Sequence, residues 1–144
     1  MAGARRTQKH LALDSNVLIA YLDREHPLHR RVTMLAHAPV ALNPTVIHET
    51  YHSLVFKLKW APEEAGRVLR EALDDSSILF LNQTRETTRI GLGLAESYRL
   101  GGRDALILAN FLHPRVAEFL TFDRTILSQK KIKRGQNELK IRSP

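Results

Sequence analysis

The chain has 144 residues, 43% hydrophobic and 26% charged, and this composition is typical of one compact globular domain with its own core. A formal net charge of +7 predicts an acidic partner, most commonly nucleic acid, although anionic lipid or an acidic protein would also fit. Because the sequence contains no cysteine, it excludes disulfides, a thiolate zinc site and a cysteine nucleophile.

Short apolar runs alternate with longer segments of helical periodicity along the chain. Strands are predicted at residues 10–13, 40–42, 78–81 and 117–121, with a possible fifth at 139–141. Helices are predicted at residues 15–22, 27–37, 44–59, 61–74, 84–100 and 103–112. This alternation predicts an α/β fold in a single domain over residues 1–144. The expected architecture is a three-layer α/β/α sandwich with a central, mostly parallel sheet of four to five strands.

Local signals mark several of the predicted boundaries. Ser15 is expected to be the N-cap of the first helix, and Asn43 followed by a proline predicts another helix start. Gly101 and Gly102 predict a C-cap for the helix over 84–100. The basic segment 130–134 is interpreted as a solvated loop, with a phosphate-binding patch as the less favoured alternative.

The N-terminal segment does not resemble a secretory signal. Residues 1–10 are polar and basic, and the apolar run that follows them is broken at once by Asp14. The longest apolar run, residues 17–22, is far too short to cross a bilayer. We therefore expect a cytoplasmic protein that does not associate with membranes.

Four acidic residues stand where the predicted fold would bring them together: Asp14, Glu49, Asp104 and Asp123. Asp14 ends the first strand and Asp123 follows the fourth, and open α/β sheets bind ligands at that edge. Asp104 lies at a helix start, where the helix dipole and free amides stabilise a carboxylate. Carboxylates packed together repel one another unless a cation neutralises them, so the pattern predicts bound Mg²⁺ or Mn²⁺.

Each of the four acids also has an ordinary structural alternative. Asp14 and Asp104 could merely cap helices, and Asp123 could begin a turn with Arg124. Glu49 has the least support from periodicity, because it lies opposite the apolar stripe of its helix. The metal-site hypothesis therefore depends on the ordered set of four rather than on any one residue.

The sequence around these acids resembles PIN-domain ribonucleases, with the motifs in the family's order. The resemblance rests on Leu13-Asp14-Ser15-Asn16-Val17-Leu18-Ile19, on Glu49 in the helix after Asn43-Pro44-Thr45, on Arg103-Asp104-Ala105-Leu106-Ile107-Leu108-Ala109 and on Leu120-Thr121-Phe122-Asp123-Arg124. It covers essentially the whole chain, whose size is similar to that of the toxin in a VapBC-type toxin–antitoxin pair.

This resemblance implies a PIN-like fold and a divalent-metal-dependent endoribonuclease that hydrolyses RNA phosphodiester bonds with Mg²⁺ or Mn²⁺. By the resemblance, the catalytic metal ligands are Asp14, Glu49, Asp104 and Asp123, and the supporting polar residues are Asn16 and Thr121. The metal would lower the pKa of a water and neutralise charge in the transition state. A small antitoxin partner and a homodimer are also implied, with an RNA-processing PIN nuclease without an antitoxin as the alternative.

Two further hypotheses compete with this interpretation. His48-Glu49-Thr50-Tyr51-His52 matches H-E-x-x-H, in which two histidines bind zinc and the glutamate is the general base of a metalloprotease. The extended form of that motif requires a glycine where Val55 stands, so a zinc protease is less favoured. A basic domain that binds RNA without cutting it is the third hypothesis, although the sequence lacks a basic stripe interleaved with aromatic residues.

Overall fold

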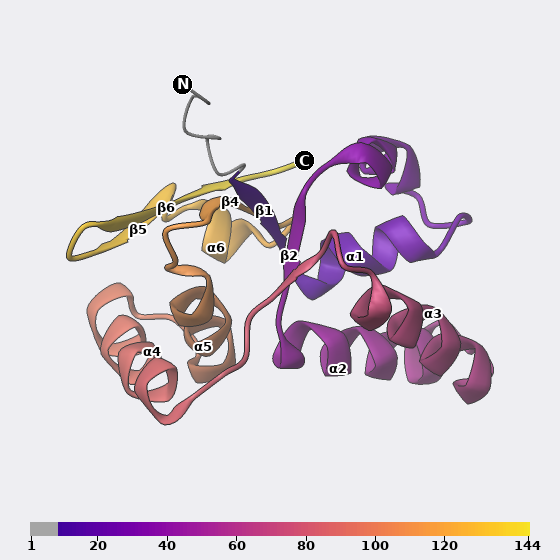
Figure 1. Cartoon of the computed structure of the whole chain (residues 1–144), viewed down its shortest axis with the longest axis horizontal. Coiled ribbons are helices and arrows are strands. Elements are labelled where there is room, and N and C mark those ends of the chain that lie inside the picture. The colour runs from indigo at the N-terminus through magenta and orange to yellow at the C-terminus, as the bar shows by residue number, and fades with distance from the viewer. Residues whose placement is uncertain (1–8) are drawn as a thin grey trace, which may run out of the picture.

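A computed structural model describes residues 9–144, so the first eight residues of the predicted domain lie outside it. In the described part, six strands form one sheet in the order β3-β2-β1-β4-β6-β5 (Figure 1). The strands are β1 (His10–Leu13), β2 (Val40–Leu42), β3 (Leu79–Phe80), β4 (Val116–Leu120), β5 (Lys131–Arg134) and β6 (Asn137–Arg142). All neighbours pair in parallel except β5 and β6, which confirms the mostly parallel sheet.

Helices lie on two sides of this sheet, as Figure 1 shows. The α-helices are α1 (Ser15–Leu22), α2 (Pro44–His52), α3 (Pro62–Asp74), α4 (Arg85–Tyr98), α5 (Gly102–Phe111) and α6 (Arg124–Leu127). Helix α2 packs on both α1 and α3, while α4 packs on α5. Successive residues of a strand face opposite sides of the sheet. Since all three residues of β2 are buried, both faces of the sheet are covered at this strand. The expected α/β/α sandwich is therefore confirmed.

The core is one continuous cluster in which α5 is the most deeply embedded helix. Its residues Ala105, Ile107, Leu108, Ala109, Asn110 and Phe111 are all buried. Phe111 contacts Phe119 of β4, with ring centroids 5.9 Å apart. A helix that is apolar on most sides is stable only when it is covered by other elements.

Within residues 9–144, no helix combines the length and the apolar composition needed to cross a lipid bilayer.

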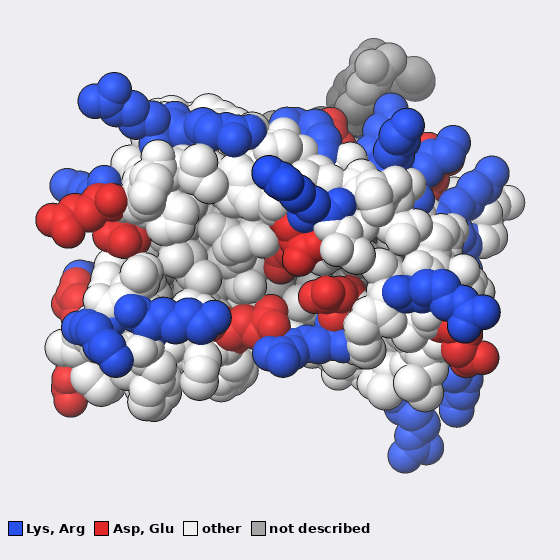
Figure 2. All heavy atoms as spheres, turned by 180° about the vertical axis from the view of Figure 1, so that it is seen from behind, with Lys and Arg blue, Asp and Glu red and all other residues white. Residues whose placement is uncertain are grey.

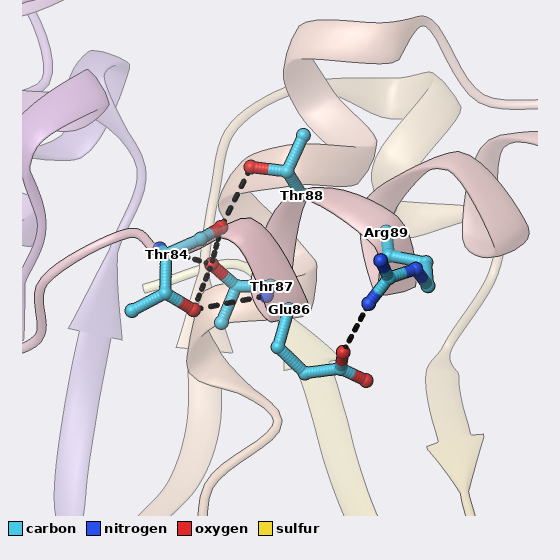
Figure 3. Close-up of polar contacts among 5 residues, drawn as sticks. All are labelled: Thr84, Glu86, Thr87, Thr88 and Arg89. Atoms are coloured by element: carbon cyan, nitrogen blue, oxygen red, sulfur yellow. Dashed lines mark hydrogen bonds and ion pairs between the residues drawn. The ribbon is translucent and has the colours of Figure 1, made fainter.

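The start of α4 is fixed by a reciprocal pair of threonines (Figure 3). Thr84 Oγ1 accepts a hydrogen bond from the Thr87 amide at 3.1 Å, and Thr87 Oγ1 accepts one from the Thr84 amide at 2.7 Å. These bonds satisfy two amides that a helix start leaves unpaired. Glu86 in the first turn and Arg89 three residues later add an exposed ion pair, with 2.6 Å between Oε2 and Nη1.

The predicted glycine C-cap of α4 is wrong. The helix ends at Tyr98, and Arg99 takes the left-handed conformation with φ 56°. This early reversal carries Leu100 into the core, where it is buried. Gly101 has φ −60° and is the N-cap of α5, and Gly102 is the first residue of that helix. The diglycine therefore opens the following helix instead of closing α4.

The segment predicted as a helix over residues 27–37 forms two short 3-10 helices, η1 (His29–Arg31) and η2 (Thr33–His37). Between them Val32 adopts φ −119° and ψ 4°, outside α-helical geometry. Val32 and Thr33 are β-branched, which lowers their helix propensity. His29 Nδ1 also lies 2.8 Å from the carbonyl oxygen of Ala20, which holds η1 against α1. Local propensity and this side-chain contact therefore outweigh the apolar periodicity.

The helix predicted over residues 44–59 changes character after α2. Asn43 is its N-cap, as predicted, and accepts a hydrogen bond from the Val46 amide at 3.0 Å. From Ser53 the chain continues as a π-helical turn, η3 (Ser53–Lys57), in which the Leu58 amide donates to the Ser53 carbonyl.

The predicted N-cap of α1 is wrong by one residue. Asp14 rather than Ser15 caps that helix, and its side chain accepts a hydrogen bond from the Ser15 amide.

The segment interpreted as a solvated loop is strand β5, so the sheet has six strands within residues 9–144 rather than four to five. Ile132 is fully buried, while the neighbouring Lys131 and Lys133 are exposed. Gly135 closes the hairpin to β6 with φ 59°, a conformation that glycine adopts without strain. One apolar residue among four basic ones carries too little alternation to identify a strand from sequence.

Candidate active site

The pairing of β1 with β4 places Asp14 beside Thr121. Leu13 lies opposite Leu120 in the parallel register, so the residues that follow each strand emerge together. The Asp14 amide donates to the Leu120 carbonyl at 2.9 Å, and Thr121 Oγ1 donates to Asp14 Oδ2 at 2.7 Å. Asp14 is 5% exposed and Thr121 is fully buried. The carboxylate is therefore held rigidly at the carboxyl edge of the two central strands.

Asn16 joins the start of α1 to the segment after β4. Its Nδ2 donates to Thr121 Oγ1 at 3.3 Å and reaches Asp14 Oδ2 at 3.5 Å. Its Oδ1 accepts from the Phe122 amide at 3.1 Å. Both residues predicted as polar supports thus contact Asp14 or each other, while their part in catalysis stays a prediction.

The other three predicted acids approach this point from separate elements. Asp123 caps α6, with Oδ1 accepting from the Ile126 amide at 3.0 Å, and its own amide donates to Thr121 Oγ1 at 3.0 Å. Asp104 lies in the first turn of α5, and Glu49 lies on α2. Figure 2 shows acidic side chains gathered in the middle of one face of the molecule, with lysine and arginine side chains around them.

The pKa values show that the four carboxylates act on one another. The pKa of Asp14 is raised from 3.8 to about 6, mainly by burial; the charges of Asp104 and Glu49 add to the rise, and the hydrogen bonds of the carboxylate oppose it. Burial also raises the pKa of Asp104, and the charges of Asp123 and Glu49 add to that rise. Each acid is thus electrostatically coupled to at least one other, as expected of a site that a cation would neutralise.

Two of the acids are engaged by other partners. Glu49 Oε2 lies 3.0 Å from Arg103 Nη1, and the Asp123 carboxylate is occupied in capping α6. Within residues 9–144, the side chains as they are positioned form no group of three or more histidine, aspartate or glutamate residues that could hold a metal ion. The donor set itself, all carboxylate oxygens, suits a hard cation such as Mg²⁺. For Glu49 to bind an ion through Oε2, that oxygen would have to leave Arg103.

We call Asp14, Glu49, Asp104 and Asp123 the acidic cluster. A hollow of about 590 Å³ adjoins it on the side of α2. Its lining residues are Pro44, Thr45, His48, Glu49, His52 and Arg103. A second hollow of about 390 Å³ lies next to it and is lined by Glu49, Gly101, Gly102, Arg103 and Asp104. Arg103 directly precedes Asp104, but nothing in the sequence pattern marks it as a site residue.

The histidines of the H-E-x-x-H motif lie on the exposed side of α2 and line the larger hollow. A catalytic zinc site needs three protein ligands. No third histidine, aspartate or glutamate joins His48 and His52 in such a group within the described residues. The same holds for the four acids as their side chains lie, so the zinc protease stays the less favoured hypothesis.

Comparisons with known proteins place the fold. A sequence model described as the PIN domain matches residues 11–133. VapC20 from Mycobacterium tuberculosis, described as a toxin that cleaves the sarcin–ricin loop, is 13% identical with a TM-score of 0.69, over 82% of this chain and 94% of its own. No curated protein matches the sequence significantly.

Two other similar structures contain more than one component. A toxin–antitoxin complex from Klebsiella pneumoniae is 23% identical with a TM-score of 0.58, over 78% of this chain and 86% of its own. VapBC2 from Rickettsia felis, bound to a promoter DNA fragment, is 13% identical with a TM-score of 0.62, over 93% and 98% respectively. At these identities the likeness shows a shared fold.

Proposed function

Since the chain belongs to the PIN-domain family, as its motifs indicated, we propose that it is a Mg²⁺- or Mn²⁺-dependent endoribonuclease. The observation that carries the proposal is the electrostatic coupling among four carboxylates that come from four separate elements. Burial and mutual repulsion already raise the pKa values of Asp14 and Asp104, a cost that a bound divalent cation would offset. A basic chain, with net charge +7, is suited to hold the RNA backbone around this acidic centre.

In this proposal the cation is held by Asp14, Asp104 and Asp123, with Glu49 joining once it leaves Arg103. When bound, it would supply positive charge to the scissile phosphate and lower the pKa of an attacking water. Hydrogen bonds from Thr121 and the Ser15 amide fix the Asp14 carboxylate, which keeps its two oxygens in a constant orientation.

We further propose that the chain is the toxin of a toxin–antitoxin pair, with a small antitoxin as partner and a homodimer as the assembled form. This part of the proposal is supported by the descriptions of the similar structures, which include VapBC and other toxin–antitoxin complexes. The alternative is a PIN nuclease that processes RNA without an antitoxin. Induction of wild type in bacteria that lack the partner should arrest growth, whereas induction of the Asp14→Asn variant should not. Unaffected growth with both would favour the processing enzyme.

The test of the chemistry is cleavage of an end-labelled RNA. Wild type should cut in Mg²⁺ or Mn²⁺ and stop in EDTA, while Asp14→Asn should lose activity by about 100-fold or more. Asp74→Asn is the matched control, because this aspartate is exposed at the end of α3. Activity that survives in Asp14→Asn would contradict the mechanism. RNA binding by wild type without cleavage in any divalent ion would favour the non-catalytic alternative.

A further inference from the structure

Three side-chain rings lie in a row along α2 and η3, beginning at the larger hollow, which the first two of them line. His48, His52 and Phe56 are spaced four residues apart, and such positions share one face of a helix. Two of them are in contact, since the rings of His52 and Phe56 have centroids 4.9 Å apart and planes inclined by 38°. We call the surface that these three rings share with Arg103 the ring groove.

Phe56 is unusual because a large apolar ring is left on the surface. It is 59% exposed, whereas a typical phenylalanine is mostly buried. It belongs to the π-helical turn η3, whose bond from the Leu58 amide to the Ser53 carbonyl spans five residues. Such turns occur frequently at functional sites. Here the turn holds Phe56 against the ring of His52 and extends the row beyond the hollow.

The ring groove is continuous with the acidic cluster. His48 and His52 line the larger hollow together with Glu49 and Arg103, and the smaller hollow shares those last two residues and reaches Asp104. A ligand in the groove would therefore extend directly to the carboxylates.

The groove also carries positive charge at both ends. Arg103, with 70% of its side chain exposed, lies at the end near the acidic cluster. At the other end, Lys59 Nζ donates to the backbone carbonyl of Phe56 at 2.9 Å, so its ammonium group is held at the backbone of the residue that carries the exposed ring. Rings flanked by cations match a chain of bases joined by phosphates.

We propose that the ring groove binds the unpaired bases of single-stranded RNA next to the phosphate that is cut. The bases stack on His48, His52 and Phe56, while Arg103 and Lys59 contact the neighbouring phosphates. Stacking on exposed rings is open to unpaired bases and closed to bases inside a duplex, so the groove selects single-stranded segments or loops. This inference rests on the proposed nuclease function and specifies its substrate.

The test uses the Asp14→Asn protein, which leaves the RNA uncut, and a single-stranded oligoribonucleotide with one 2-aminopurine. Stacking quenches the fluorescence of this base, and anisotropy of an end label gives Kd. Phe56→Ala and His52→Ala, each added to Asp14→Asn, should weaken binding about tenfold and abolish the quenching. Phe56→Trp should retain both, because it restores a stacking surface.

Leu92→Ala is the matched control, since this side chain is 62% exposed on α4, away from the groove, and it should change neither signal. A duplex of the same sequence should bind with an affinity that does not depend on Phe56. Unchanged affinity and quenching in both ring variants would overturn the inference. A protein partner that requires Phe56, together with RNA binding that does not, would assign the surface to protein recognition instead.

The two proposals fail in different ways. If wild type neither binds nor cuts RNA, the nuclease function and the ring groove are both refuted. If wild type cuts RNA with Mg²⁺, and Phe56→Ala and His52→Ala change neither RNA binding by the Asp14→Asn protein nor cleavage when introduced alone, only the ring groove is refuted.

Discussion

Replacement of Asp14 by asparagine should stabilise the metal-free protein at neutral pH. The side chain is 5% exposed, and burial with the charges of Asp104 and Glu49 raises its pKa from 3.8 to about 6. The folded state therefore binds this proton more tightly than the unfolded state, and the free energy of unfolding decreases as pH rises between those two values. At about 1.4 kcal/mol per pH unit, the charged carboxylate costs about 3 kcal/mol above pH 6.

Asparagine removes that cost while keeping much of the local geometry. It is as good an N-cap as aspartate, and its Oδ1 can still accept from the Ser15 amide. The bond from Thr121 Oγ1 would be disturbed, at a cost of about 1 kcal/mol. The net expectation is a variant about 2 kcal/mol more stable than wild type at pH 7.5, and slightly less stable than wild type below pH 4.

Urea unfolding followed by circular dichroism, in EDTA at pH 3.8 and pH 7.5, measures this difference. Asp74→Asn is the control and should leave stability within about 0.5 kcal/mol at both pH values. Added Mg²⁺ should narrow the gap at pH 7.5, because it stabilises only the protein that binds it. An Asp14→Asn variant that is less stable by the same amount at both pH values would refute the electrostatic reasoning.

Three further predictions concern the same region and its support. Thr121→Val should lower the free energy of unfolding at pH 7.5 by about 1–3 kcal/mol, since it removes the donor to Asp14 and the acceptor of two other bonds; an unchanged urea midpoint would contradict this. Gly91→Ala should cost about 1–3 kcal/mol, because the added Cβ would stand 3.1 Å from the Leu106 Cα atom. The Cβ added by Gly93→Ala meets no atom within 4 Å, so this variant should instead stabilise the protein by up to about 1 kcal/mol in the same urea unfolding assay; equal effects would show that α4 and α5 do not pack as described. Calorimetric Mn²⁺ affinity should decrease as pH falls through about 6, where Asp14 binds a proton in the metal-free protein, and a flat profile between pH 5 and 8 would exclude this carboxylate as a ligand.

The sequence allowed prediction of the features that depend on strong local patterns. The apolar run that ends at Leu13 identified β1, and Asn43 before a proline identified the start of α2. Asp14 could be placed at the edge of the sheet because it directly follows a strand. Thr121 follows β4, the strand that pairs with β1, and donates a hydrogen bond to Asp14 at that edge.

The features that could not be predicted from the sequence depend on contacts between segments that are distant along the chain. The ion pair of Arg103 with Glu49 exists because α5 packs beside α2, which no local pattern encodes. Strand β5 is stabilised by the burial of Ile132 and by its pairing with β6, while its own sequence is almost entirely basic. In the sequence Phe56 looks like an ordinary helix residue. Its position in the π-helical turn and its ring contact with His52 become visible only in the structure.

The central claim is that the four acids hold the divalent cation that cleavage needs. The most direct test is a crystal of the protein soaked in Mn²⁺, with diffraction recorded at the manganese absorption edge. The account predicts an anomalous peak bounded by Asp14, Asp104 and Asp123, with Glu49 turned away from Arg103 toward the ion. A peak between His48 and His52 and none at the carboxylates, in a protein that cuts RNA with Mn²⁺, would contradict it.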